Sequence, residues 1–234
     1  MLLMKGRRVK VNWERTKEKF KGRFCAAGLD LSAVDDLTCC VYMFPRDEDR
    51  THVDVLMRTW CCWEKIHTEK NRYKDQYESW LHDGWLEETD GNAIDYDLVR
   101  KQVVEDAQFF DLKLIGVDRQ FQGIEFSIKL GEDLGHTEKC PIVITCTNHP
   151  AKIGPVCQEF ERRVLEKKIN HGGNPILRFM IDSVAIRQDA DGNRKPDKDK
   201  SQGKIDGVVS MLYALDRLMR SSPKKKKIRV PFSV

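Results

Sequence analysis

The sequence predicts an α/β protein built on a mixed sheet, in which an antiparallel three-strand meander is joined to parallel strands and helices flank the sheet. Two observations support this prediction. The first third of the chain holds three β-rich runs separated by turn-forming stretches, and the later part alternates short apolar runs with helical patterns. A long helix with an apolar stripe closes the chain, and we expect it to cover the sheet.

The meander is predicted from three β-rich runs at residues 24–31, 37–44 and 52–60. Turn-forming residues separate the first run from the second, and the polar stretch 45–50 separates the second from the third. Strands joined by such short connections usually lie next to each other in a sheet. The three runs are therefore expected to pair in sequence order.

Helices and further strands follow the meander in alternation. Apolar spacing predicts helices at 64–81, 96–110, 122–130 and 154–169, and short apolar runs predict strands at 112–118 and 140–147. Residues 175–188 begin as a helix and end as a strand, and residues 189–193 form a hairpin-like turn. A closing helix at 201–220 carries the apolar stripe Ile205, Val208, Val209, Leu212, Leu215, Leu218 and Met219. This order of elements is that of the ribonuclease H-like fold.

Composition excludes several broad classes of protein. With 234 residues, 40% hydrophobic and 33% charged, the chain is that of a globular domain and not of a disordered, collagen-like or coiled-coil protein. Because no apolar run approaches the length of a membrane span and the start MLLMKGRRVK lacks the core of a secretory signal, neither membrane insertion nor secretion is expected. The eight cysteines include no C-x-x-C pair, so zinc is not indicated.

Charge is distributed unevenly along the chain, whose net charge is +4. Residues 1–23 carry nine Lys and Arg against two Glu, a net of +7, and the tail after residue 223 carries +5, which leaves −8 for residues 24–223. An acidic body can gather metal cations, and basic ends can follow a polyanion such as DNA. We therefore divide the chain into a basic N-terminal segment or linker (1–23), one folded domain (24–220) and a basic C-terminal tail (221–234).

Three aspartates occupy positions where a buried charge needs a reason. Asp30 follows the small apolar run 26–29, Asp118 ends the apolar strand 112–118, and Asp206 lies at the edge of the stripe of the closing helix. A carboxylate buried alone would be destabilised by loss of water, whereas a divalent cation offsets that cost by coordination. Each residue alone is a weak signal, because an Asp at a strand end is more often a turn residue. As a set, they are interpreted as catalytic metal ligands.

The chemistry of these ligands indicates which metal they would bind. Oxygen ligands without a nearby His or Cys cluster favour Mg²⁺ or Mn²⁺ over zinc. Two such ions catalyse phosphodiester hydrolysis, one by activating water and the other by stabilising the leaving 3′ oxygen. Three carboxylates from two strands and a helix can build a site of this kind, so two ions are expected.

A basic cluster precedes the closing helix and consists of Arg194, Lys195, Lys198, Lys200 and Lys204. These side chains are predicted to contact the DNA backbone beside the scissile phosphate, where point charges suffice for binding that does not depend on sequence. A solvated loop is the alternative, because Asp197 and Asp199 dilute the charge.

Short motifs along the chain also carry a resemblance to a known family. They are residues 28–32 (GLDLS), 36–38 (DLT), 92–96 (NAIDY), 117–119 (VDR), 171–175 (HGGNP), 195–198 (KPDK) and 204–207 (KIDG). Over about residues 24–220 the chain resembles the nuclease half of the large terminase subunit of tailed bacteriophages. In that family the domain is ribonuclease H-like, and Asp30, Asp118 and Asp206 match its acidic metal ligands.

The resemblance implies a metal-dependent endonuclease that cuts concatemeric double-stranded viral DNA before and after the capsid is filled. Expected partners are double-stranded DNA, the portal and the small terminase subunit, and the expected location is the host cytoplasm at the procapsid. The phosphate-loop pattern G-x-x-x-x-G-K-[ST] of the packaging ATPase does not occur, so ATP hydrolysis is not expected of this chain. Whether it is an excised nuclease domain or a stand-alone nuclease of the same lineage stays open.

Other functions remain open at this point. One alternative is another ribonuclease H-like nuclease, such as a junction resolvase or an RNA-strand hydrolase. A second alternative is a catalytically silent domain that docks DNA, portal or small terminase. The intact acidic positions favour an enzyme.

Overall fold

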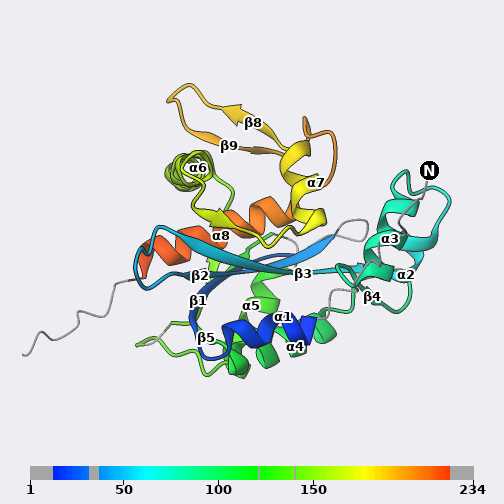
Figure 1. Ribbon diagram of the computed structural model, residues 1–234, viewed down its shortest axis with the longest axis horizontal. Coiled ribbons are helices and arrows are strands. Elements are labelled where there is room, and N and C mark those ends of the chain that lie inside the picture. The colour runs from blue at the N-terminus through cyan, green and yellow to red at the C-terminus, as the bar shows by residue number, and fades with distance from the viewer. Residues whose placement is uncertain (1–12, 32–36, 121, 140, 222–234) are drawn as a thin grey trace, which may run out of the picture.

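A mixed sheet forms the centre of the molecule (Figure 1). The computed structural model describes residues 13–31, 37–120, 122–139 and 141–221. In these residues, the strands follow the order β4-β3-β2-β1-β5-β6, and the short strand β7 pairs with β3. Strands β1, β2 and β3 are antiparallel neighbours, whereas β5 and β6 continue the sheet from β1 in parallel. The predicted ribonuclease H-like α/β architecture, a meander joined to parallel strands, is thus confirmed.

The strands of this sheet have the following bounds: β1 Phe24–Asp30, β2 Thr38–Pro45, β3 Val53–Cys62, β4 Glu87–Thr89, β5 Asp111–Asp118, β6 Val143–Cys146 and β7 Ile169–Asn170. Strands β8 (Ala185–Gln188) and β9 (Arg194–Asp197) form a separate antiparallel hairpin. Central strands β1 and β2 are buried almost throughout, because both faces of the sheet are covered.

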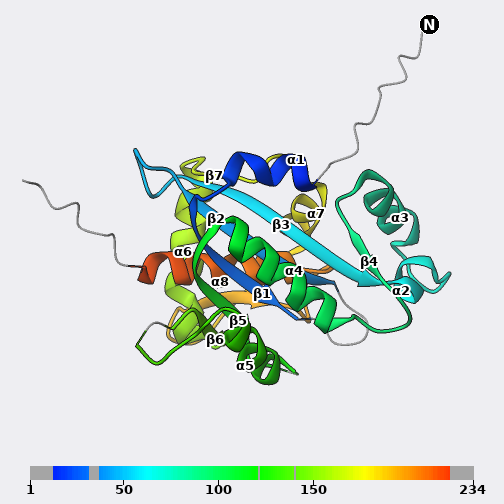
Figure 2. The same ribbon diagram turned by 90° about the horizontal axis from the view of Figure 1, so that it is seen from below.

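Helices cover both faces of the sheet (Figures 1 and 2). On one face lie α6 (Pro150–Leu165), α7 (Pro175–Ser183) and α8 (Asp206–Arg220), with the β8–β9 hairpin outside them. The opposite face carries α1 (Trp13–Lys17), α4 (Tyr96–Phe109) and α5 (Gly123–Asp133). Helices α2 (Trp63–His67) and α3 (Lys74–Asp83) lie beyond the end of β3. None of the helices in the described ranges is long and apolar enough to span a membrane.

Two glycines let the closing helix approach the middle of the sheet. Gly28 of β1 and Gly116 of β5 are register partners on neighbouring strands. A Cβ atom built on Gly28 would lie 2.0 Å from the Ser210 carbonyl oxygen and 2.5 Å from the Ala214 nitrogen, both backbone atoms of α8. Because Gly28 has no side chain, the backbones of β1 and α8 are in direct contact. This contact fixes the end of β1 relative to the start of α8.

The opposite face holds a buried network of charged side chains. The Arg58 Nε lies 2.7 Å from an Asp106 carboxylate oxygen, and its Nη1 donates to Glu87 at 2.9 Å. The Tyr42 hydroxyl donates to Asp106 at 3.1 Å. Helix α1 reaches the same group, because the Trp13 indole N–H lies 3.4 Å from Asp106 and its ring packs on the Arg58 guanidinium. Trp13 thus packs α1 against the body of the domain.

One predicted helix is divided in the structure. The sequence predicts a single helix at 64–81, but α2 ends at His67 and α3 begins at Lys74. The buried Asn71 causes the break, because its side-chain amide donates to the Lys65 carbonyl oxygen at 2.9 Å and its Oδ1 accepts from the Tyr73 N–H at 3.0 Å. These local bonds compete with helical ones and favour a turn.

Candidate active site

The three predicted aspartates lie at the ends of elements that meet at one edge of the sheet. Asp30 is the last residue of β1, Asp118 is the last residue of β5, and Asp206 is the first residue of α8. Strands β1 and β5 are parallel, with Leu29 beside Val117, so the two carboxyl ends lie next to each other. All three side chains are buried, with Asp30 2% and Asp206 1% exposed.

Ser210 ties the helix to the strands at this edge. Its hydroxyl oxygen accepts from the Asp30 N–H at 3.1 Å and lies 2.8 Å from the carbonyl oxygens of Cys39 and Asp206. One hydroxyl therefore contacts β1, β2 and the first turn of α8. This small polar residue in the apolar stripe of the helix fixes Asp206 relative to Asp30.

A lysine lies between two of the carboxylates. The Lys198 ammonium is 3.0 Å from Asp30 Oδ2 and 3.0 Å from Asp206 Oδ1. Burial by itself would lower the pKa of Lys198, but the two carboxylates outweigh burial and raise it, so the side chain stays charged. Its position shows where the site attracts a cation.

The loop before α8 holds Lys198 in this place. Asp197, buried at the end of β9, accepts from the backbone N–H of Asp199 at 3.1 Å. The Ser201 hydroxyl donates to the Asp197 carbonyl oxygen at 2.6 Å and accepts from the Ala185 N–H at 3.0 Å. This turn directs Lys198 back toward the sheet. The sequence predicts Lys198 as a DNA contact, whereas the structure places its ammonium group between Asp30 and Asp206.

Asp118 is held by different partners. Its Oδ2 accepts from the Tyr213 hydroxyl at 3.1 Å, and its Oδ1 accepts from the backbone N–H of Gln120 at 3.0 Å. Burial, with the Asp118 charge in addition, raises the pKa of Tyr213, so the phenol remains a donor. Tyr213 therefore orients Asp118 from the middle of α8, a role that its apolar surroundings in the sequence did not reveal.

Burial also changes the chemistry of Asp30. Loss of water raises the pKa of Asp30 to about 8; Lys198 opposes the rise, and the carboxylates of Asp206 and Asp118 add to it. Burial therefore disfavours the charged form of Asp30, and positive charge beside the carboxyl favours that form. The electrostatics of the cluster therefore favour binding of further positive charge.

Asp30 is expected to make the metal-free protein less stable as pH rises. Its pKa is raised from 3.8 to about 8, so between these values the folded state holds a proton that the unfolded state has lost. Each rise in pH within this window then favours unfolding. Asp30→Asn removes this pH dependence and should raise the melting temperature near pH 8. The expected shift is about 2–4 °C for each kcal/mol by which the variant increases the free energy of unfolding.

Thermal melts in a chelator between about pH 5 and pH 9 measure this effect. Asp75→Asn, which changes an exposed carboxylate of α3, is the matched control and should follow the wild-type curve. If the melting temperatures of wild type and Asp30→Asn change with pH in parallel, the pKa of Asp30 is not raised on folding.

The donor set fits a hard divalent cation in chemistry and in charge. Asp30 and Asp206 direct carboxylate oxygens at one cationic group, and Asp118 lies beside them on the neighbouring strand. Within the described ranges, no three Asp, Glu, His or Cys side chains are arranged closely enough to hold a metal ion. In this structure Lys198 bridges the carboxylates of Asp30 and Asp206, and Asp118 bonds to Tyr213.

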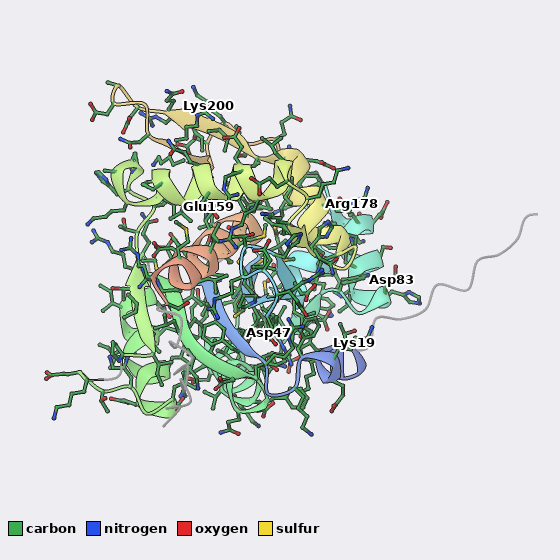
Figure 3. All side chains as sticks on the ribbon, turned by 60° about the vertical axis from the view of Figure 1, so that its left-hand side comes forward. Lys19, Asp47, Asp83, Glu159, Arg178 and Lys200 are labelled. Carbon is green, nitrogen blue, oxygen red and sulfur yellow. The ribbon has the colours of Figure 1, made fainter. Side chains whose placement is uncertain are left out.

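The remaining members of the predicted basic cluster are spread over the outer layer. Arg194 pairs with Glu161 of α6 at 2.9 Å, and Lys200 is exposed in the turn after β9, in the outer layer with the hairpin (Figure 3). Lys195 lies in β9, half-buried. Lys204 lines an open pocket next to Asp206. Within this set, Lys198 contacts Asp30 and Asp206 directly, at 3.0 Å from each.

A mixed sheet of this order, with buried carboxylates where two parallel strands and the closing helix meet, defines a nuclease domain of ribonuclease H-like fold. The family model described as the endonuclease domain of the terminase large subunit matches residues 10–222. The chain belongs to this family.

Two curated relatives support the assignment. The chain is 32% identical over 197 residues to the large terminase subunit of Enterobacteria phage HK97, covering 81% of this chain and 36% of the phage protein. It is 28% identical over 213 residues to the protein YmfN of Escherichia coli strain K12, covering 87% of this chain and 45% of YmfN. The chain thus spans less than half the length of these relatives.

Solved structures show the same fold. The crystal structure of the HK97 large terminase matches with a TM-score of 0.73 and 27% identity, over 89% of this chain and 43% of the other. The large terminase nuclease of the thermophilic phage G20c, crystallised with bound magnesium, matches with a TM-score of 0.54 over 84% of each chain. Its identity is 8%, so this second likeness concerns the fold alone.

Proposed function

We propose that this domain is a metal-dependent endonuclease that cuts concatemeric double-stranded viral DNA during genome packaging, by two-metal-ion phosphodiester hydrolysis. The observation that carries the proposal is the convergence of Asp30 and Asp206 on one cationic group, 3.0 Å from each, beside Asp118. Membership of the terminase endonuclease family and the bound magnesium of the related G20c nuclease support it.

In this proposal Asp30, Asp118 and Asp206 hold two Mg²⁺ or Mn²⁺ ions, which supply activation of water and stabilisation of the leaving 3′ oxygen. Tyr213 keeps Asp118 oriented through its hydroxyl, and Ser210 keeps the start of α8 against β1. Lys198 neutralises two of the carboxylates in the metal-free protein, and with bound metal its ammonium group would be available to contact a phosphate. Arg194, Lys195, Lys200 and Lys204 would follow the DNA backbone outside the cluster.

Double-stranded DNA is the proposed substrate, and the portal and small terminase subunit are the proposed partners. The proposed place of action is the host cytoplasm at the procapsid. These proposals rest on the family, since the chain covers 36% of the HK97 protein. The net charge of −8 over residues 24–223 gives the domain as a whole little long-range attraction for DNA, so local basic groups and other parts of a motor would position the substrate.

Plasmid digestion with Mg²⁺, with Mn²⁺ and with a chelator tests the proposed activity. Nicking and linearisation are expected with either metal and should stop with the chelator. Parallel assays on duplex DNA, four-way junctions and RNA–DNA hybrid separate this activity from a junction resolvase or an RNA-strand hydrolase. No cleavage of any substrate with either metal would favour a silent docking domain instead.

The basic tail is expected to contribute to DNA affinity but not to the chemistry. Residues 224–229 carry five positive charges, and residues 222–234 lie outside the described residues. Deleting residues 223–234 should weaken binding of duplex DNA and lower the slope of log affinity against log salt, because fewer counterions are released. Cleavage at saturating DNA should be unchanged. Anisotropy titrations over a salt series measure this, and an unchanged salt slope would show that the tail does not touch DNA.

A further inference from the structure

An open basic pocket adjoins the acidic site. It lies between the connection of α2 to α3 (residues 68–73, here the α2–α3 connection) and the loop leading into α8, and its volume is about 370 Å³. Its charged lining residues are Lys65, Lys70, Arg72, Lys198, Lys204 and Asp206. Asp206 is the single acidic side chain among the described residues of this lining, so the pocket is strongly cationic.

The topology of the sheet places this pocket beside the aspartates. Strand β3 is antiparallel to β2, which is antiparallel to β1, so β3 and β1 end at the same edge of the sheet. Helix α2 begins directly after β3 (Figure 1). The pocket, which is lined by the residues that follow α2 and by Asp206, therefore lies at the edge where Asp30 and Asp206 lie. Asp206 belongs to both the pocket and the acidic cluster.

The α2–α3 connection has a fixed shape. Asn71 is buried and bonds through its side chain to the Lys65 carbonyl oxygen and the Tyr73 N–H. Its own N–H donates to the Thr68 carbonyl oxygen at 3.0 Å. Lys70 and Arg72 flank this buried residue on either side and are exposed. The loop thus presents two cations on a rigid support.

The connection is also fixed to the loop before α8. Arg72 Nη2 donates to the Gln202 carbonyl oxygen at 2.6 Å, and the Tyr73 hydroxyl donates to the same oxygen at 3.0 Å. The Gln202 N–H donates in turn to the Ser183 carbonyl oxygen at 3.1 Å. Gln202 precedes Asp206 by four residues, so these bonds hold Lys70 and Arg72 at a set distance from the acidic site.

The lining indicates the chemistry of the ligand. Lysine ammonium groups and an arginine guanidinium, which keeps further N–H donors after bonding to one carbonyl oxygen, are the groups that bind phosphate oxygens in proteins. The acidic cluster repels DNA, so a substrate phosphate at the scissile position needs attraction from groups close to it. The predicted cluster supplies less of this attraction than its charge suggests, since Arg194 pairs with Glu161 and Lys198 bridges two aspartates.

We propose that the pocket binds a backbone phosphate of duplex DNA next to the scissile phosphate, with Lys70 and Arg72 as the contacting residues. This inference rests on the proposed nuclease function and assigns the α2–α3 connection to substrate binding. Because phosphate contacts carry no base information, binding at this place orients the strand without selecting a sequence.

The test measures binding of a short labelled DNA duplex to the full chain by fluorescence anisotropy in a chelator, so that no cleavage occurs. Lys70→Ala with Arg72→Ala should raise the Kd about tenfold near physiological salt and lower the salt slope by about one to two units. Lys70→Glu alone should weaken binding further than Lys70→Ala, and it leaves the Arg72 contact with Gln202 intact. The double variant Lys101→Ala with Lys129→Ala removes the same charge from α4 and α5 on the opposite face and is the matched control.

A second readout separates this inference from the proposed function. The small ester bis(p-nitrophenyl) phosphate needs the acidic site for its hydrolysis with Mn²⁺ but offers no neighbouring backbone phosphate. Lys70→Ala should therefore lose DNA affinity by a much larger factor than it loses hydrolysis of this ester. Wild-type DNA affinity in Lys70→Glu, or an equal loss in the control variant, would overturn the pocket assignment. If wild type hydrolyses neither this ester nor plasmid DNA, the proposed nuclease function fails independently of the binding result.

Discussion

Each of the variants Asp30→Asn, Asp118→Asn and Asp206→Asn is expected to lose DNA cleavage by about 100-fold or more while keeping the fold. The change removes one negative oxygen ligand and conserves side-chain volume. The effect should be largest for Asp30 and Asp206, because these two carboxylates face the same cationic group. Supercoiled-plasmid nicking under single-turnover conditions measures the loss, and isothermal titration with Mn²⁺ measures metal binding separately.

Asp199→Asn is the matched control for this series. Asp199 lies in the same loop as Lys198 and is exposed, so the same chemical change there should leave cleavage and Mn²⁺ binding unchanged. Circular dichroism and melting temperature should confirm that all four variants fold. A wild-type nicking rate in any of the three site variants would remove that residue from the proposed ligand set.

Tyr213→Phe tests how Asp118 is positioned. The change removes the hydroxyl that donates to Asp118 Oδ2 and leaves the ring in the core. Loss of such an orienting partner typically costs 10- to 100-fold in metal affinity or activity, less than loss of the ligand itself. Addition of higher Mn²⁺ concentrations should restore part of the rate, which a purely structural defect would not allow.

Much of the site could be predicted because the sheet and the closing helix are encoded locally. Asp30 and Asp118 each end an apolar run, and parallel neighbouring strands bring such ends together. The periodic stripe of α8 predicts the helix that carries Asp206, although the helix starts five residues later than expected. That difference arises because residues 197–201 form a hydrogen-bonded turn around Asp197.

Other features depend on contacts between residues far apart in sequence. The bridge from Lys198 to Asp30 joins residues 168 positions apart, and nothing in the local pattern distinguishes Lys198 from Lys195 or Lys200. The break between α2 and α3 depends on side-chain bonds of Asn71, which helical periodicity does not record. Strand β4 has three residues and exists because it pairs with β3. Such short elements carry too few residues to show a periodic pattern.

The contact between β1 and α8 is the structural basis of the site. Asp30 lies two residues after Gly28, and Asp206 lies four residues before Ser210, whose carbonyl oxygen faces Gly28. Any increase in the distance between the two backbones at this point therefore moves the two carboxylates apart. The spacing of the two carboxylates therefore depends on a glycine that has no functional side chain of its own.

Gly28→Ala is accordingly expected to impair both stability and cleavage. The new Cβ would lie 2.0 Å from the Ser210 carbonyl oxygen and 2.5 Å from the Ala214 nitrogen, and neither backbone atom can rotate away as a side chain could. Helix α8 must shift outward, which we expect to cost about 3 kcal/mol or more of unfolding free energy. A displacement of about 1 Å at the carboxylates is enough to lower cleavage by about 100-fold.

Urea denaturation and plasmid nicking at low temperature, where the variant remains folded, measure the two effects separately. Gly131→Ala in α5 is the matched control, because the atom nearest to its Cβ would be the His136 Cβ at 3.3 Å, a contact that a shift of a few tenths of an ångström relieves. The control should stay within about 1 kcal/mol of wild type and cleave normally. If Gly28→Ala is destabilised but nicks DNA at the wild-type rate once folded, the distance between β1 and α8 does not control the carboxylates. If Gly28→Ala changes neither the unfolding free energy nor the nicking rate, β1 and α8 do not approach as closely as described. Asp30 and Asp206 must then be brought together by Lys198 and the turn at residues 197–201.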